Sequence, residues 1–174
     1  MPCHDEPSRP LEDHAMPFDD LLAADRIVML MDPIDRNTVL DAAARLLAGD
    51  PGGLTQAIAE GLRARERAAS TAIGRGVALP HCRDNAFAGA RGAFLRLAYP
   101  VDFGAGDGEP VDLVFAMCAP EDETGEHLHT LAKLAERFSD AQLREDLREA
   151  TEMRAIRDAL LSTSRGDIWN IATA

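Results

Sequence analysis

His81 is the residue whose type and position most clearly suggest chemistry in this sequence. It closes residues 74–81, Gly-Arg-Gly-Val-Ala-Leu-Pro-His, and follows Pro80 directly after an apolar segment. Proline lacks a backbone N–H and ends a strand's hydrogen-bond ladder, which predicts that His81 lies at a sheet end or edge. An imidazole in that place can act as a nucleophile. A strand-end histidine satisfied by ordinary hydrogen bonds fits the same local pattern.

His127 has a helical spacing that directs its side chain toward a core. At about 100° per residue it shares one stripe with Leu131, Leu134 and Phe138, whereas His129 falls on the opposite, solvent-facing side. His127 is also close to the N-terminus of its predicted helix, where free backbone N–H groups can receive an anion such as phosphate. The alternative is a histidine that is satisfied within the core and has no chemical role.

Arg65 continues the apolar face of another predicted helix. Ile58, Leu62 and Arg65 share one side of this helix, whereas Arg63 and Arg67 are expected at the surface. An arginine at the end of an apolar stripe must find an anion or stay partly exposed. That anion is either a structural carboxylate or a phosphate held through two N–H groups.

Several other catalytic arrangements are disfavoured. The sequence contains no G-x-x-x-x-G-K-[ST] loop, no H-E-x-x-H motif and no G-x-S-x-G motif. His127 and His129 lie on opposite faces of one helix and cannot chelate a single metal ion. Cys82 follows His81, but adjacent residues on an extended chain point to opposite sides, which argues against a Cys–His nucleophile pair. We therefore expect neither a metal nor a cofactor.

The composition limits the class of partner. The 174 residues include 30 Asp and Glu against 18 Lys and Arg, for a net charge of −12. This excess disfavours nucleic acid and favours a protein partner with a basic patch. Three cysteines without close spacing (Cys3, Cys82, Cys118) suit a reducing cytosol. Because no signal peptide and no run of ~18 apolar residues is present, we expect a cytoplasmic protein without membrane insertion.

The apolar patterns predict a chain that alternates between strands and helices. Strands are expected at 26–31, 70–73, 77–79, 92–99 and 111–119. Helices are expected at 21–22, 35–47, 54–67, 124–138, from Ser139 with Gln142 completing a capping box, and at 151–161. The almost wholly apolar segment 111–119 predicts a central strand that is covered on both faces.

These elements predict one α/β domain, at residues 18–161, with a mixed β-sheet of about five strands flanked by helices on both faces. Residues 1–17 carry four prolines among charged residues and are expected to form a poorly ordered arm. Residues 162–174 are expected to form a tail.

Two segments of this sequence carry a family resemblance. The first is Arg-Glu at 65–66 followed by Ser-Thr-Ala-Ile-Gly-Arg-Gly-Val-Ala-Leu-Pro-His at 70–81, and the second is Glu-His-Leu-His-Thr-Leu at 126–131. Together they closely resemble the enzyme IIA domains of the fructose/mannitol class (type 2) of the bacterial phosphotransferase system. The likeness covers about residues 19–161. It is nearest to the nitrogen-regulatory branch, because no transporter or carrier domain is fused here.

The resemblance implies roles for the three site residues. His81 matches the phosphorylated histidine, and His127 and Arg65 match the groups that stabilise the phosphate. The family phosphorylates Nε2, and a backbone carbonyl that accepts from Nδ1–H would fix that tautomer. Cys82 stands where the family usually has glycine. A cysteine disfavours a positive φ at that position, and its thiol is either a small core group or a redox-sensitive one.

Three functions are compatible with the resemblance. The first is a phosphocarrier that accepts phosphate from an HPr-like carrier protein and regulates transporters or sensor proteins by its phosphorylation state. The second is an enzyme IIA that passes phosphate to a sugar-specific IIB domain. The third is a binding module that works without phosphorylation, which the presence of all three site residues argues against.

Overall fold

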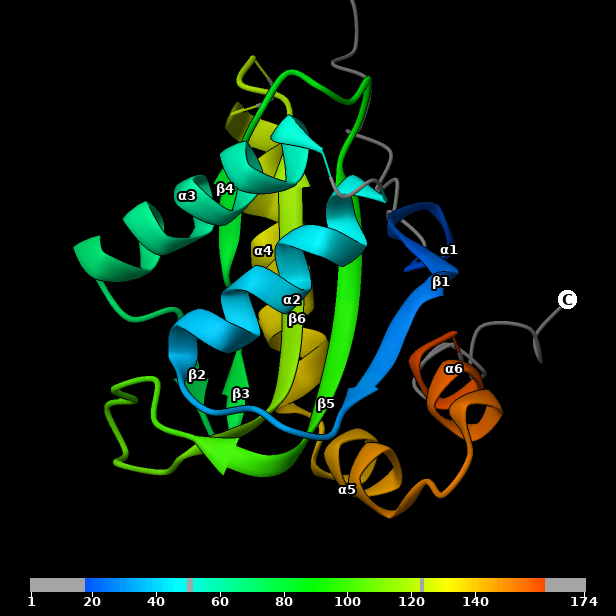
Figure 1. The fold of residues 1–174 in the computed structure, drawn as a ribbon. Helices are drawn as coiled ribbons and strands as arrows, with labels where there is room; N and C mark the ends of the chain where they lie inside the picture. Colours follow the sequence, from blue (N-terminus) through cyan, green and yellow to red (C-terminus); the bar gives the residue numbers. More distant parts are fainter. Residues whose placement is uncertain (1–17, 50–51, 123, 162–174) are drawn as a thin grey trace, which may run out of the picture.

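Six β-strands form one mixed sheet with helices on both of its faces (Figure 1). The computed structural model describes residues 18–49, 52–122 and 124–161, and the predicted arm and tail lie outside these ranges. The strands are β1 (Leu22–Leu30), β2 (Ala72–Gly74), β3 (Val77–Ala78), β4 (His81–Arg83), β5 (Arg91–Val101) and β6 (Val111–Ala119). Their order is β1-β5-β6-β3-β2, and β4 also pairs with β6. The predicted fold class is confirmed, with one strand more than expected.

The additional strand is β4, which continues the line of β3 along the same edge of β6. Both run parallel to β6, and the pairing pauses between them at Leu79 and Pro80. It resumes with His81 opposite Met117, whose N–H donates to the Pro80 carbonyl at 2.9 Å. Proline removes only the donor side of the ladder, so the strand line survives it. The sequence pattern predicted the pause but not the resumption, which depends on a strand distant in sequence.

Five of the helices cover the two faces of the sheet (Figure 1). One face carries α2 (Arg36–Ala48) and α3 (Gly53–Ala68), and the other carries α4 (Thr124–Ser139), α5 (Ala141–Glu149) and α6 (Met153–Leu161). A short helix, α1 (Phe18–Leu21), precedes β1. No helix within the described ranges is long and apolar enough to cross a lipid bilayer.

The central strand β6 is buried on both faces, as its continuous apolar pattern predicts. Alternate side chains point to opposite sides of a strand. Phe115 and Met117 therefore pack with α4, α5 and α6, whereas Ala116 and Cys118 pack with α2 and α3. This strand separates two apolar cores and gives β4 a rigid neighbour.

The turn between β2 and β3 requires its glycines. Gly74, Arg75 and Gly76 all have positive φ, at 87°, 56° and 76°. Glycine adopts this left-handed region without steric cost. β2 and β3 pair antiparallel across the turn, as the sequence predicts, and β3 leads directly to His81.

Several predicted element ends are wrong: β1 begins at Leu22 instead of residue 26, β2 spans Ala72–Gly74 instead of 70–73, and α6 begins at Met153 instead of residue 151. The short helix at 21–22 lies earlier, because Leu22 already belongs to β1. The helix expected to be capped by Ser139 is α5, and its N-cap is Asp140, whose carboxylate accepts from the Gln142 N–H at 2.9 Å. Ser139 is the last residue of α4 and donates its hydroxyl to the Glu136 carbonyl instead. The carboxylate at the neighbouring position thus takes the capping role.

Candidate functional site

The His81 imidazole is held at both of its nitrogens. Its Nδ1 lies 2.8 Å from the Leu79 carbonyl, which can only accept, so Nδ1 carries the hydrogen. Its Nε2 lies 3.1 Å from Arg65 Nε, which can only donate, so Nε2 presents its lone pair. Two independent contacts therefore select the same neutral tautomer. The nitrogen that is left as a nucleophile is Nε2.

Arg65 reaches His81 from the C-terminal turn of α3. Its Nη1 donates to the Ala69 carbonyl at 2.8 Å, in the segment that follows the helix. The side chain is only half-buried, which agrees with an arginine that ends an apolar stripe. Instead of a carboxylate, its Nε finds the imidazole nitrogen, an interaction that the spacing along the helix did not predict.

His127 lies on α4 with its ring centroid 5.3 Å from that of His81. The side chain is 5% exposed, and Leu134 and Phe138 of the predicted stripe are buried with it. His129 is exposed. The helical spacing therefore separated the two histidines correctly. His127 Nδ1 is buried and makes no hydrogen bond within the described residues, which is unusual for a buried polar atom.

Both imidazoles are kept neutral by their surroundings. Burial is the main cause that lowers the pKa of His81, and the positive charges of Arg65 and Arg83 act in the same direction. The hydrogen bond to Leu79 opposes this change. Burial lowers the pKa of His127 to about 4, with help from His81 and Arg83. At neutral pH the nucleophilic, uncharged form of each ring therefore predominates.

A cleft of about 370 Å³ connects these groups. Its lining includes Arg65, His81 and His127 together with Leu128 and Leu131. The structure thus brings all three predicted site residues to one cavity. Within the described residues, no group of three or more His, Cys, Asp and Glu side chains has the arrangement to hold a metal ion.

Arg83 also lines the cleft and was not singled out from the sequence. It lies two residues beyond His81 on β4, so the two side chains share one side of the strand. Its Nη1 donates to the Glu121 carbonyl at 3.2 Å. Period-2 spacing identifies this residue once β4 is known, but the strand itself was not expected after Pro80.

Cys82 belongs to the core between the sheet and α3. A Cβ built on Gly61 of α3 would come within 3.1 Å of the Cys82 Cβ, so the helix lies close against this position. Cys82 and Cys118 are paired in register on β4 and β6, so their side chains lie on the same face of the sheet, and both belong to this core. Arg75 is the only non-glycine residue with positive φ in the described ranges. Residue 82 therefore needs no glycine to form the strand.

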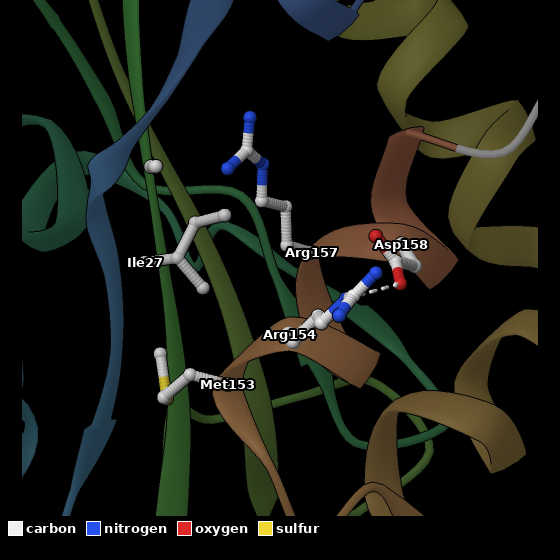
Figure 2. A pocket seen from close by; sticks show the side chains of 6 residues that line it. Ile27, Met153, Arg154, Arg157 and Asp158 are labelled. Carbon is white, nitrogen blue, oxygen red and sulfur yellow. Dashed lines mark ion pairs between the residues drawn. The ribbon is translucent and has the colours of Figure 1, made fainter.

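A second hollow lies between β1 and α6, away from the histidines (Figure 2). Its volume is about 590 Å³, and its lining includes Ile27, Met153, Arg154, Arg157 and Asp158. Arg154 and Asp158 form an ion pair of 3.7 Å on the exposed side of the helix. The larger hollow thus contains arginines but no imidazole.

Comparison with known proteins gives one consistent result. Residues 20–163 match the family described as "Phosphoenolpyruvate-dependent sugar phosphotransferase system, EIIA 2". A nitrogen regulatory protein of Pseudomonas aeruginosa is 39% identical over 75% of this chain and 86% of its own length. The crystal structure of the nitrogen regulatory protein IIA-Ntr from Neisseria meningitidis is similar, with a TM-score of 0.74 and 36% identity, over 82% of this chain and 98% of that one.

A more distant relative shares the fold alone. The enzyme IIAMtl of Escherichia coli, solved in a complex with phosphorylated enzyme IIBMtl, is 18% identical with a TM-score of 0.66. The alignment covers 80% of this chain and 96% of that one. The fold is therefore shared with a protein of low sequence identity.

Proposed function

Because the chain belongs to the EIIA 2 family of the phosphoenolpyruvate-dependent phosphotransferase system, we propose that it is a cytoplasmic phosphocarrier with a phosphohistidine intermediate at His81. An HPr-like carrier protein donates the phosphoryl group, and the phosphorylation state then regulates transporters or sensor proteins. The observation that carries this proposal is the double constraint on the imidazole, which leaves Nε2 as the nucleophile at the cleft.

The proposed step is an in-line phosphoryl transfer. The Nε2 lone pair forms a bond to phosphorus while the bond from phosphorus to the carrier's histidine nitrogen breaks, and that electron pair leaves with the carrier's imidazole. The His81 ring gains positive charge and keeps its Nδ1–H. The Leu79 carbonyl, which already accepts this hydrogen, favours the charged ring because it lies at the positive N–H.

Arg65 has two consecutive tasks in this proposal. In the free protein its Nε donates to Nε2, which helps to select the tautomer. When phosphorus approaches, the guanidinium turns from the nitrogen to the phosphate oxygens, which it can hold through two N–H groups. His127, with a ring nitrogen that lacks a hydrogen bond, supplies a further donor next to the same oxygens.

Incubation with phosphoenolpyruvate, enzyme I and an HPr-like carrier tests the proposal. The wild-type chain is expected to gain one acid-labile phosphate. His81→Ala is expected to gain none, and His129→Ala, an exposed histidine on the same helix as His127, is expected to behave as wild type. Absence of label on the wild type, or its persistence in His81→Ala, contradicts the proposal.

A second candidate is a relay to a sugar-specific IIB domain. It is favoured by the similarity to the fructose-specific EIIA component of Haloferax volcanii, which is 33% identical over 66% of this chain and 75% of its own length. Regulation is favoured by the similarity to nitrogen regulatory proteins, with 39% identity to the Pseudomonas aeruginosa protein and 36% to the Neisseria meningitidis structure. Addition of IIB domains to the labelled chain separates the two, because rapid loss of label indicates a relay and slow loss indicates regulation.

A further inference from the structure

Glu66 is a buried carboxylate beside the site for which the phosphate chemistry gives no role. It follows Arg65 in α3 and is only 4% exposed. Both of its oxygens accept from the Thr71 N–H at 3.2 Å, and one also accepts from the Thr71 hydroxyl. The Arg36 guanidinium of α2 lies 3.8 Å away. Because carboxylates are rarely buried unless paired, this arrangement indicates a constraint that the fold maintains.

Thr71 links the carboxylate to His81 through the backbone. The Thr71 carbonyl accepts from the Leu79 N–H at 3.0 Å. The Leu79 carbonyl in turn lies 2.8 Å from His81 Nδ1. Glu66 therefore holds Thr71, and Thr71 holds Leu79. The Leu79 carbonyl in turn selects the imidazole tautomer. Each step of this relay is a hydrogen bond between named groups.

The same segment also holds Arg65. The Arg65 Nη1 donates to the Ala69 carbonyl, two residues before Thr71. The Ala69 N–H donates back to the Arg65 carbonyl at 3.4 Å. By tying Thr71 to α3, Glu66 thus anchors the short segment on which both contacts of the imidazole depend.

We infer that Glu66 is a positioning residue for phosphoryl transfer: it holds the Thr71–Leu79 relay that keeps hydrogen on His81 Nδ1 and leaves Nε2 as the nucleophile. The inference rests on the proposed function. The negative charge of Glu66 adds a second effect, because it favours a positively charged His81 ring. Phosphorylation at Nε2 produces such a ring. A carboxylate that only joined α3 to β2 would have no influence on the tautomer.

The test compares Glu66→Ala and Glu66→Gln with the wild type by nitrogen NMR of the His81 ring. The wild type is expected to hold hydrogen predominantly on Nδ1. In Glu66→Ala a mixture with hydrogen on Nε2 is expected, and the rate of phosphorylation by the carrier is expected to fall by about 10–100-fold, as for other groups that orient a functional histidine. Glu66→Gln keeps an acceptor oxygen for Thr71 and is expected to recover part of both losses.

Asp41→Asn is the matched control. It removes the ion pair between Asp41 of α2 and Arg63 of α3, and so weakens the packing of α3 without touching Thr71. It is expected to lower the unfolding temperature while the tautomer and the rate stay within twofold of the wild type. If Glu66→Ala is too unstable to study, Thr71→Val removes the hydroxyl contact alone, and Thr71→Ser restores it. A smaller shift of tautomer and rate in the same direction is then expected, reversed in the serine variant.

The outcomes separate this inference from the proposed function. An unchanged tautomer and an unchanged rate in folded Glu66→Ala overturn the positioning role while the phosphocarrier function stands. A changed tautomer in a chain whose wild type accepts no phosphate supports the relay and overturns the function. The NMR measurement needs no phosphate donor, so it decides on the relay independently.

Discussion

Among the arginine-lined hollows in the described part of the chain, the cleft at His81 and the hollow between β1 and α6 differ most clearly, because only the cleft contains imidazoles. The hollow between β1 and α6 is the larger, at about 590 Å³ against about 370 Å³ for the cleft at His81. Its Arg154 and Asp158 side chains are 87% and 70% exposed, so water screens their attraction. In the cleft, by contrast, Arg65 and His81 are joined by a hydrogen bond with fixed roles for donor and acceptor. Volume therefore says less about function than the way in which polar groups are held.

The two hollows also differ in what their polar groups contribute to the free energy of unfolding. An exposed ion pair contributes about 0.2–1 kcal/mol at most. A buried polar atom without a partner, such as His127 Nδ1, costs about 1–3 kcal/mol. The cleft thus keeps a group that is unfavourable for stability, which is typical of sites that are completed by a ligand.

The largest expected effect separates the two arginines. Arg65→Ala removes the group proposed to neutralise charge on the transferring phosphate, and a loss of about 10³-fold in the phosphorylation rate is expected. Arg157→Ala, in the other hollow, is expected to stay within twofold of the wild type. Rates of label uptake from the phosphorylated carrier measure both. Equal losses in the two variants would remove the distinction between the hollows.

Sequence patterns predicted the side chains of the cleft better than their contacts. The stripe of His127 with Leu134 and Phe138 gave its inward direction, because helical spacing is a local property. The bond between Arg65 and His81 depends on how α3 crosses β4, and β4 itself depends on β6. Arg83 was missed for the same reason. Helix ends were wrong by one or two residues, as at Met153 and at Ser139 and Asp140, where two capping residues are adjacent.

Acid is expected to destabilise the protein through the cleft. Since the pKa of His127 falls from 6.5 to about 4 on folding, the unfolded chain binds more protons between these values. Stability is therefore fully present above about pH 6.5 and is lost as the pH falls toward 4, by about 3 kcal/mol for this group. The lowered pKa of His81 acts in the same direction. Urea unfolding at pH 7.5 and pH 4.5 measures the loss.

His127→Gln and Arg157→Ala make this measurement specific. The glutamine variant cannot take up a proton and is expected to lose most of the 3 kcal/mol pH dependence that the His127 imidazole contributes. The Arg157→Ala variant is expected to keep the wild-type dependence, because arginine stays charged throughout this range. A His127→Gln variant as acid-sensitive as the wild type would contradict the assignment of the effect to the cleft.

Removal of the second imidazole is expected to have a smaller effect on phosphoryl transfer than removal of Arg65. His127→Ala eliminates one proposed donor to the phosphate oxygens, and a rate loss of about 10²-fold is expected. His129→Ala, which alters the exposed side of the same helix, is expected to change the rate by less than twofold. Stopped-flow or quenched-flow uptake of labelled phosphate compares them. A His127→Ala variant that accepts and retains phosphate as the wild type does would exclude it from the site.

Cys82 sharpens the comparison within the cleft itself, because it lines the cavity but its thiol belongs to the core. The interaction with Cys118 and, second, burial raise the pKa of the Cys82 thiol, and a thiol kept protonated reacts slowly with peroxide. With Cys3 replaced by serine throughout, mild peroxide is expected to leave the phosphorylation rate of the parent chain and of its Cys82→Gly variant equally unchanged. Slowing confined to the chain that retains Cys82 would show a redox-sensitive thiol next to His81. Equal behaviour of the two means that residue 82 needs only to be small enough to fit beneath α3.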